Sequence, residues 1–577
     1  MKKILLLIVH LFIMLNVSAQ DPATLNSIIK QFTKIDCIKK GNPTDMGYPH
    51  YMVAATYMMG DVYPSHDIGY DWFAVYNTMQ IKEDYNVALI SWYTSYNIID
   101  LCNSFIKQYN ASTGDKTDQE VATAGAVYAI RAFCYYTLMV LYEPIPNVYT
   151  DCSKVLGLTV PIVTENTSEE ERAKNPRVSH SEMMKFILSD LEIAETSLQK
   201  WYFDDNTIPN LSVVYGIKAK VYLWDNDFGN AATYARKAID EAVSKGAYPM
   251  SATEWEEPLT GCIKARSAWI WYMNVIATSI YTHLTSWLCG EAGDDGYSGA
   301  TLPVIDRELY DMIGEKDFRK TTYLNPQKYK YYNYLTSRDR SFIESAPAYL
   351  AIKFRHSEAY NGFVDNEYGG YWTAMTVYDL PLMRLEELYL IEAEAIGVSK
   401  GLSLGLEKLN DFIKSYRDPL YNYETSDLRA FQIEVLNQMR IEFWGEGKAF
   451  SVAKRLRPGV MQNYTGSNAP ELSEFRINCK GIKPVWNMVI PQKAIDENSA
   501  LVGYNNPIPF DCIKTPSPID QYSDGKYSDT KINNITSDII QDGYSIYGID
   551  GKRRGQLQKG LNIIRTKDGK TKKVFVK

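Results

Sequence analysis

The sequence lacks the motifs of the common catalytic and nucleotide-binding sites. It contains no G-x-S-x-G, no P-loop, no H-E-x-x-H and no G-x-G-x-x-G after a predicted strand. Carboxylate pairs such as Glu392/Glu394 occur in nearly any chain with 69 acidic residues. The sequence therefore predicts no catalytic residues, no metal site and no cofactor. Histidine is also scarce, and the five that follow the first 19 residues are isolated from one another: His50, His66, His180, His283 and His356.

Long hydrophobic runs are missing except at the N-terminus, where the pattern is that of an export signal. Lys2-Lys3 precedes an apolar run from Ile4 to Leu15, and Val17-Ser18-Ala19 places small residues at the cleavage positions. The run is too short to span a bilayer comfortably. We therefore expect residues 1–19 to be a signal peptide and the mature chain to begin at Gln20.

Closely spaced cysteines are missing as well. The eight Cys are irregularly spaced without a C-x-x-C, and the first, Cys37, lies too far downstream to be the lipidated residue of a lipoprotein. Cys102 and Cys134 stand among apolar residues at helical spacing, which favours buried free thiols. Export would permit disulfides as the alternative, and the spacing does not give their connectivity.

Tyrosine and negative charge are what the sequence has in excess. Of 577 residues, 45% are hydrophobic and 23% charged, as in ordinary globular proteins, but there are 44 Tyr against 19 Phe. The net charge is −8, yet residues 541–577 carry a local +7, and with the signal's two lysines set aside residues 20–540 stand near −17. An acidic body argues against a nucleic-acid partner, and many tyrosines suggest wet, ligand-contacting surfaces.

Apolar residues at helical spacing dominate residues 24–455 and predict a mainly α protein. Several predicted helices come in pairs: Asp225-Asn226-Asp227 separates one pair, and Gly397 and Gly401 mark the break in another. Small residues at the expected helix contacts resemble those of tetratricopeptide repeats. The predicted helices are Val121–Tyr142, Ser181–Lys200, Val213–Trp224, Asn230–Val243, Leu382–Ile396, Leu404–Tyr416 and Leu428–Phe443.

We expect β structure only in short pairs and in the C-terminal tail. The segment SAWIWYMNV (267–275) predicts a buried strand, whereas 289–303 and 361–373 read as aromatic loops. Three further strands are predicted in the tail, at Tyr544–Ile549, Leu561–Arg565 and Lys573–Val576. The expected organisation is a signal peptide (1–19), a helical binding domain (20–506), a linker (507–540) and a small β tail (541–577).

Six segments carry motifs that occur in the same order in one known family. The segment SWYTSYNIIDLCNSFI (91–106) has a Trp-x-x-x-Tyr-x-x-Ile-x-x-x-Asn helix, and 122–146 has an Ala-Arg-Ala-aromatic helix ending in a turn and Pro. The others are 160–198 with Arg177 and an Asp-Leu-x-x-Ala helix, 382–397, 441–456 and the Ile-Pro … Asn-Pro segment 489–507. Together they resemble the SusD/RagB family, surface glycan- and nutrient-binding proteins of Bacteroidetes-type outer membranes.

This resemblance implies a single α-rich domain in which four tetratricopeptide-like helix pairs support an irregular binding region. It implies a non-catalytic protein at the extracellular face of the outer membrane, which captures an oligosaccharide or similar nutrient and passes it to a SusC-like TonB-dependent transporter. The matching charged residues are expected to be architectural, forming buried ion pairs between helices rather than a catalytic cluster. These are Arg384, Glu386, Glu392 and Glu394.

Two features depart from the family pattern. The lipidated cysteine that members normally carry at the mature N-terminus is missing. The Gly-punctuated, basic tail (541–577) instead resembles the C-terminal sorting signal of the type IX secretion system. Such a signal is an address read by a receptor, and it would replace the lipid in reaching the cell surface. The alternative is a small accessory β domain.

Two other functions stay open at this point. A tetratricopeptide-type adaptor would bind peptides or proteins on a concave helix face. A secreted glycoside hydrolase would need two carboxylates at a set separation across the sugar.

Sugar rings present apolar faces and a rim of hydroxyls, so their sites combine aromatic platforms with polar side chains. Three segments outside the helical pattern combine the two: 69–77, 286–297 and 367–373. We predict that the ligand binds there, although packing against the core is the alternative for any one aromatic. The predicted platforms are Tyr70, Trp72, Trp287, Tyr297, Tyr371 and Trp372, and the predicted hydroxyl acceptors are Asp71, Asn77, Asp294 and Asp295.

Overall fold

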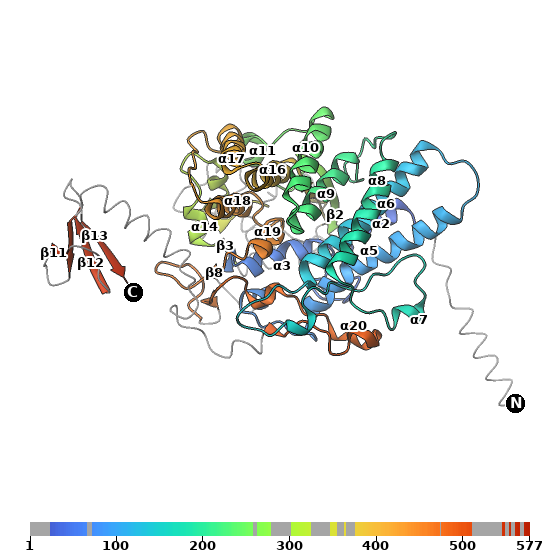
Figure 1. Cartoon of the computed structure of the whole chain (residues 1–577), viewed down its shortest axis with the longest axis horizontal. Coiled ribbons are helices and arrows are strands. Elements are labelled where there is room, and N and C mark those ends of the chain that lie inside the picture. Colours follow the sequence, from blue (N-terminus) through green and yellow to red (C-terminus); the bar gives the residue numbers. More distant parts are fainter. Residues whose placement is uncertain are drawn as a thin grey trace.

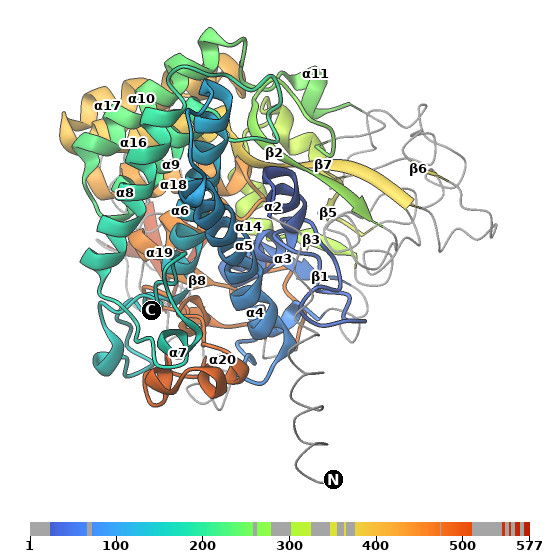
Figure 2. The same ribbon diagram turned by 90° about the vertical axis from the view of Figure 1, so that its right-hand side faces the viewer.

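The computed structural model describes most of the body and the strands of the tail. In the body it describes residues 23–65, 72–257, 262–277, 302–324, 347–354, 363–364, 375–472 and 475–509. In the tail it describes 545–548, 553–554, 560–565 and 571–576. Helices form most of the described body, and Figure 2 shows most of them gathered on one side, with strands β2, β7 and β6 on the other.

The helices pack as neighbouring pairs (Figure 1), which confirms the mainly α prediction. Helix α5 packs on α6, α6 on α8, α9 on α10, α10 on α16 and α16 on α17. The described helices are α2 (Leu25–Gln31), α3 (Pro49–Met59), α4 (Ala74–Asn77), α5 (Asn86–Ala111), α6 (Asp118–Tyr142), α7 (Glu169–Arg172), α8 (His180–Ser197), α9 (Leu211–Trp224), α10 (Phe228–Ser244), α11 (Ala252–Trp255), α14 (Arg307–Asp311), α16 (Leu385–Ser399), α17 (Leu402–Tyr416), α18 (Leu428–Glu442), α19 (Ala449–Leu456) and α20 (Gln492–Glu497), with 3₁₀ turns η2 (Ser153–Val155), η3 (Phe318–Thr322), η7 (Pro484–Trp486) and η8 (Ser499–Leu501).

The strands form small antiparallel sheets. One sheet has the order β1-β3-β5-β4, a second the order β2-β7-β6, β8 pairs with β9, and the tail strands have the order β11-β10-β12-β13. The strands are β1 (Val62–Pro64), β2 (Trp269–Ala277), β3 (Pro303–Ile305), β4 (Tyr323–Leu324), β5 (Leu350–Ala351), β6 (Phe363–Val364), β7 (Met375–Arg384), β8 (Val460–Met461), β9 (Asn478–Cys479), β10 (Ser545–Gly548), β11 (Arg553–Arg554), β12 (Gly560–Arg565) and β13 (Thr571–Val576).

The ribbon of β2 and β7 is longer than the short pairs that the sequence predicts. Strand β7 has 10 residues, and its register joins Trp269 to Arg384. The helix predicted from Leu382 therefore begins only at Leu385, because the residues before it pair with β2. The predicted strand itself is confirmed, and both Trp269 and Trp271 are 1% exposed.

Small residues set the spacing of the paired helices. Asn226 turns between α9 and α10 with φ of 62°, and Gly401 caps α17 with φ of 125°, as the sequence predicts for these breaks. Gly397, in contrast, lies inside α16 rather than at the break. A Cβ on Gly397 would overlap the ring of Phe431, so glycine there permits α16 and α18 to approach closely.

We expect Gly397→Ala to destabilise the protein by about 1–3 kcal/mol, the usual cost of inserting a methyl group into a filled core. The measurement is the free energy of unfolding in urea. Gly229→Ala is the matched control, because a Cβ on Gly229 in α10 would meet only Asp227 Oδ1 at 3.7 Å. Equal stability of the two variants would contradict the tight contact between α16 and α18.

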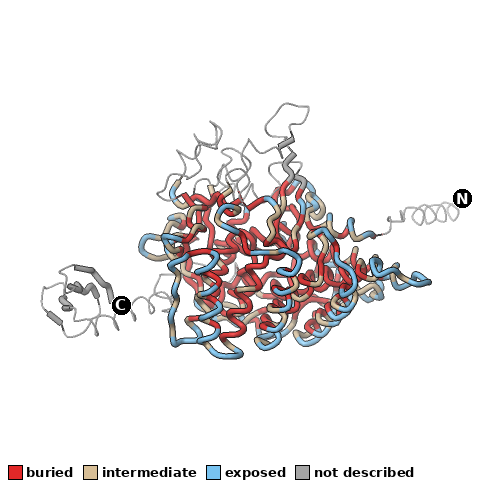
Figure 3. The backbone as a smooth tube through the Cα atoms, turned by 90° about the horizontal axis from the view of Figure 1, so that it is seen from above, coloured by how far each residue is buried: buried red, intermediate tan, exposed pale blue. Residues whose placement is uncertain are grey.

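Helix α6 is buried over most of its length. A capping box of Thr117 and Glu120 begins the helix, and Glu143, in an extended conformation, caps its C-terminal end. Among the described helices it alone is long and apolar enough to cross a bilayer, and its apolar window lies entirely inside the protein. Figure 3 shows the same distribution for the body, with buried backbone inside and exposed residues on the outer turns.

The predicted buried ion pairs are present. Arg384 pairs with Glu442 and Glu446, Glu392 with Arg236, and Glu394 with Arg455 at 2.6 Å. Arg417 joins Glu386 at 3.0 Å, and all the carboxylates of this set are at most 3% exposed. These acidic groups tie α16, α18 and their neighbours together, which is an architectural role.

Two other sequence predictions concern the thiols and the tail. Cys102 and Cys134 are buried free thiols, as predicted. In the tail, β10, β12 and β13 match the three predicted strands, and β11 is an additional short strand that pairs with β10. Among the described strands, those of the tail pair only with one another.

Candidate functional site

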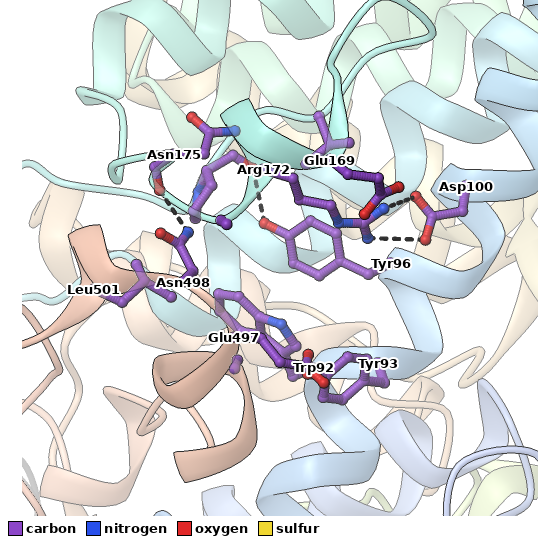
Figure 4. A pocket seen from close by; sticks show the side chains of 14 residues that line it. Trp92, Tyr93, Tyr96, Asp100, Glu169, Arg172, Asn175, Glu497, Asn498 and Leu501 are labelled. Carbon is purple, nitrogen blue, oxygen red and sulfur yellow. Dashed lines mark hydrogen bonds and ion pairs between the residues drawn. The ribbon is translucent and has the colours of Figure 1, made fainter. Parts of the chain in front are cut away.

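A pocket of about 440 Å³ opens where three distant parts of the chain meet (Figure 4), and we call it the α5–α20 pocket. One wall is helix α5, the second is the segment that follows α6 and includes α7, and the third is α20 with η8. The lining residues are Trp92, Tyr93, Tyr96 and Asp100; Pro161, Val163, Glu169, Arg172, Ala173 and Asn175; and Ala494, Glu497, Asn498 and Leu501.

Helix α5 presents its lining residues because they are spaced by one turn. Trp92, Tyr96 and Asp100 are four residues apart, so they form one row on the helix surface. Trp92 is 4% exposed and is fixed between two other rings, with centroids 4.9 Å from Tyr96 and 4.8 Å from Tyr142. The row therefore runs from a rigid aromatic floor to a carboxylate.

Tyrosine hydroxyl groups hold the second wall in place. Tyr96 donates to the carbonyl oxygen of Pro161 at 2.7 Å. Tyr135 donates to the carbonyl oxygen of Val163 at 2.8 Å and accepts from the N–H of Val163 at 2.7 Å. Burial raises the pKa of Tyr96 well above its usual value. These hydroxyl groups are buried, so these two tyrosines stabilise the fold. The abundance of tyrosine had suggested solvent-exposed, ligand-contacting surfaces instead.

Arg172 closes one side of the pocket through a bidentate ion pair with Asp100. Its two terminal nitrogens donate to the two carboxylate oxygens, each at 2.9 Å. Helix α7 positions Arg172 because Ser168 and Glu171 form a capping box at its start. The two side chains are 35% and 41% exposed, so the pair lies at the mouth.

Tyr93 and Glu497 close the opposite side. The Tyr93 hydroxyl donates to Glu497 Oε2 at 2.5 Å, and Lys493 Nζ lies 4.7 Å from the centre of the Tyr93 ring. Burial and the neighbouring Glu497 carboxylate raise the pKa of Tyr93 above its usual value. Tyr93 therefore stays protonated and oriented at neutral pH, with part of its ring toward the pocket.

Hydrogen bonds join the second and third walls. Asn498 donates to the carbonyl oxygen of Asn175 at 2.6 Å, and the N–H of Ser499 donates to the carbonyl oxygen of Ala173 at 2.9 Å. Asn175 in turn donates from its side chain to the carbonyl oxygen of Ile162 at 2.7 Å. The pocket thus depends on contacts between residues more than 300 positions apart.

The chemistry of the pocket is that of a binding site with an aromatic floor and a polar rim. Such sites suit a ligand with an apolar face and several hydroxyl groups. Within the described ranges, no group of three or more His, Cys, Asp or Glu is arranged to hold a metal ion.

Only two of the ten predicted site residues fall in the described part. Trp72 precedes α4 and is 40% exposed. Asn77 ends α4 and is completely buried, with its side chain donating to the carbonyl oxygen of Val62 at 2.8 Å. Neither lines the α5–α20 pocket, and their role as ligand contacts stays a prediction. The other eight lie outside the described residues: Tyr70, Asp71, Trp287, Asp294, Asp295, Tyr297, Tyr371 and Trp372.

The sequence reasoning missed the pocket because it assigned 91–106 and 160–198 to architecture. The four-residue spacing of Trp92, Tyr96 and Asp100 was the signal that could have suggested a site on α5. No sequence signal connects Glu497 and Asn498 to that row.

Comparison with known proteins gives the following matches. Residues 18–223 match the SusD-like_3 family, described as "Starch-binding associating with outer membrane". SusD-like protein P2 of Formosa agariphila is 24% identical over 400 residues, which cover 66% of this chain and 74% of that protein. The first two walls of the pocket lie in the region matched by the family.

Solved structures share the fold. A SusD-like carbohydrate binding protein from Bacteroides vulgatus has a TM-score of 0.63 at 21% identity, over 84% of this chain and 97% of that one. Surface glycan-binding protein A from Bacteroides thetaiotaomicron, in complex with laminarihexaose, has a TM-score of 0.58 at 15% identity, over 84% and 98%. The resemblance to the SusD/RagB family and the helical fold that it implied are confirmed.

Proposed function

We propose that this SusD-like protein binds glycans at the cell surface and holds an oligosaccharide in the α5–α20 pocket without cleaving it. The observation that carries the proposal is the fixed aromatic floor of Trp92 and Tyr96 beside a rim of carboxylate and amide groups. The bound laminarihexaose of the Bacteroides thetaiotaomicron protein supports a glycan as the ligand class.

The aromatic loops are proposed as a second contact for a longer glycan. Their residues are Tyr70, Asp71 and Trp72; Trp287, Asp294, Asp295 and Tyr297; and Tyr371 with Trp372. A glycan longer than the pocket would need such platforms outside it.

We place the protein at the extracellular face of the outer membrane, beside a SusC-like TonB-dependent transporter that receives the glycan. The signal-peptide pattern of residues 1–19 and the outer-membrane description of the matching family support this location. The tail is proposed to be the sorting signal that takes the protein there.

A screen of soluble glycans, with analysis of the products, separates this function from the two alternatives. We expect binding by calorimetry and no new reducing ends. Cleavage would indicate a glycoside hydrolase. If the protein neither binds nor cleaves any glycan, the result would contradict the proposal and favour a peptide-binding adaptor of the tetratricopeptide type.

Tyr93→Ala tests the pocket directly. Loss of the ring should weaken glycan binding by about 1–3 kcal/mol, the range for a buried aromatic contact. Tyr109→Ala is the matched control, because Tyr109 is on the same helix but stacks on Phe105, away from the lining. If Tyr93→Ala keeps wild-type glycan affinity while Ala variants in the proposed aromatic loops lose affinity, the glycan binds at those loops instead of in the pocket.

A further inference from the structure

Hydrogen bonds already join most of the polar side chains that line the α5–α20 pocket. The donors of Tyr93 and Tyr96 bond to Glu497 and to the Pro161 carbonyl oxygen, and both terminal nitrogens of Arg172 bond to Asp100. The side-chain amides of Asn175 and Asn498 donate to backbone carbonyl oxygens. Each of these five side chains therefore donates at least one hydrogen bond within the protein.

The lining also offers acceptor oxygens that can bind a ligand. Among the described residues, Glu169 forms no ion pair. Glu497 accepts from Tyr93 through one oxygen, and Lys493 is 3.7 Å from the other. A carboxylate has about four lone-pair sites, so both groups can accept more hydrogen bonds. The Oδ1 atom of Asn175 adds a neutral acceptor.

The lining carries more acidic than basic side chains. Asp100, Glu169 and Glu497 are acidic, and Arg172 is the basic residue of the lining. Because both terminal nitrogens of Arg172 face Asp100, its charge is compensated inside the protein. Glu169 and Glu497 remain, one at each side of the opening, with Lys493 paired to Glu497 at 3.7 Å, and the remaining body of the chain is acidic as well.

We infer that the α5–α20 pocket selects sugars that donate hydrogen bonds, neutral or bearing an ammonium group, and rejects sugars that carry a carboxylate or sulfate. The inference rests on the proposed glycan-binding function. A hydroxyl group can donate to Glu169 and Glu497, and these bonds to ionised acceptors are strong. A carboxylate in the same place offers no proton and meets charge of its own sign.

Matched pairs of sugars test the inference. The probes are laminarihexaose, cellohexaose and maltohexaose, each compared with its form oxidised at C6, in which a carboxylate replaces the CH₂OH group. Alginate, polygalacturonate and chitosan oligosaccharides extend the set. We expect a bound neutral hexaose to lose affinity by about tenfold or more on oxidation, because the new carboxylate lies near charges of its own sign.

The outcomes separate the inference from the proposed function. Acidic sugars that bind as tightly as neutral ones, or alone, would overturn the inference and leave glycan binding intact. Failure of every sugar in the set to bind would overturn both.

Neutralising the two glutamates assigns the discrimination to this pocket. The double variant Glu169→Gln, Glu497→Gln keeps the side-chain shapes, and we expect the preference for the neutral form to fall to less than about threefold once the two charges are gone. Glu170→Gln is the matched control, because Glu170 is on the same short helix but pairs with Lys174 outside the lining. An unchanged preference in the double variant would show that other groups cause the discrimination.

Discussion

Glu442→Gln is expected to destabilise the protein by about 3–5 kcal/mol, because it leaves buried guanidinium groups without their shared partner. Glu442 is completely buried and accepts from three arginines. Arg319 reaches it at 3.0 Å, Arg384 at 2.5 Å, and Arg417 at 2.7 and 2.8 Å. The variant keeps the volume of the side chain and removes only its charge, so cavity formation does not contribute.

The same cluster gives the protein a dependence on acid. Burial alone would raise the pKa of the Glu442 and Glu446 carboxyls. Instead, Arg417 and Arg384 hold the pKa of Glu442 well below 4.5, and Arg384 and Lys353 lower the pKa of Glu446 to about 2. Carboxyls with a lowered pKa in the folded state stabilise the protein fully above pH 4.5, and this stability is lost as the pH falls toward 2. Unfolding in urea between pH 7 and pH 3 should therefore show a smaller loss in Glu442→Gln than in the wild type.

Glu407→Gln is the matched control for the cluster. Glu407 is exposed on α17, and surface substitutions of this kind change stability by less than about 0.5 kcal/mol. If Glu442→Gln unfolds at the same urea concentration as Glu407→Gln, the buried cluster is not what holds α16 and α18 together.

Deletion of residues 541–577 is expected to abolish display at the cell surface and to leave the body unchanged. The described tail strands pair only with one another, so the body loses none of its sheet pairing. The tail also carries a local +7, opposite in sign to the body. We expect the truncated protein to keep its melting temperature and its glycan affinity, while protease added to intact cells no longer cleaves it.

A fusion provides the control for this deletion. The tail, attached to an exported protein that has no surface signal of its own, should bring that protein to the surface if it is an address. A truncated protein that still reaches the surface would contradict the sorting function, and a truncated body that unfolds earlier would indicate an accessory β domain.

Sequence reasoning predicted the helices well because their apolar periodicity is local. The limits of α6, α9 and α18 lie within three residues of the prediction. It failed where tertiary pairing overrides a local pattern: Met383 and Arg384 continue a helical pattern but pair with β2. The prediction that Gly397 marks a helix break was wrong for a related reason, because glycine is needed there to make room for Phe431 on another helix.

The candidate site was less predictable than the fold. Its floor was present in the sequence as Trp92 and Tyr96, but the same residues also fit a buried helix face, and periodicity does not distinguish the two. Its third wall depends on contacts such as Asn498 with Asn175, which local sequence does not encode. The arrangement of Glu497 opposite Asp100 follows from the fold alone.

A crystal structure of the protein with a bound neutral oligosaccharide would test the account most directly. The account predicts an uncleaved sugar in the α5–α20 pocket, with a ring face toward Tyr93 or Trp92 and hydroxyl groups donating to Glu169 and Glu497. An empty pocket, with the sugar bound only by the segments 286–297 and 367–373, would contradict it.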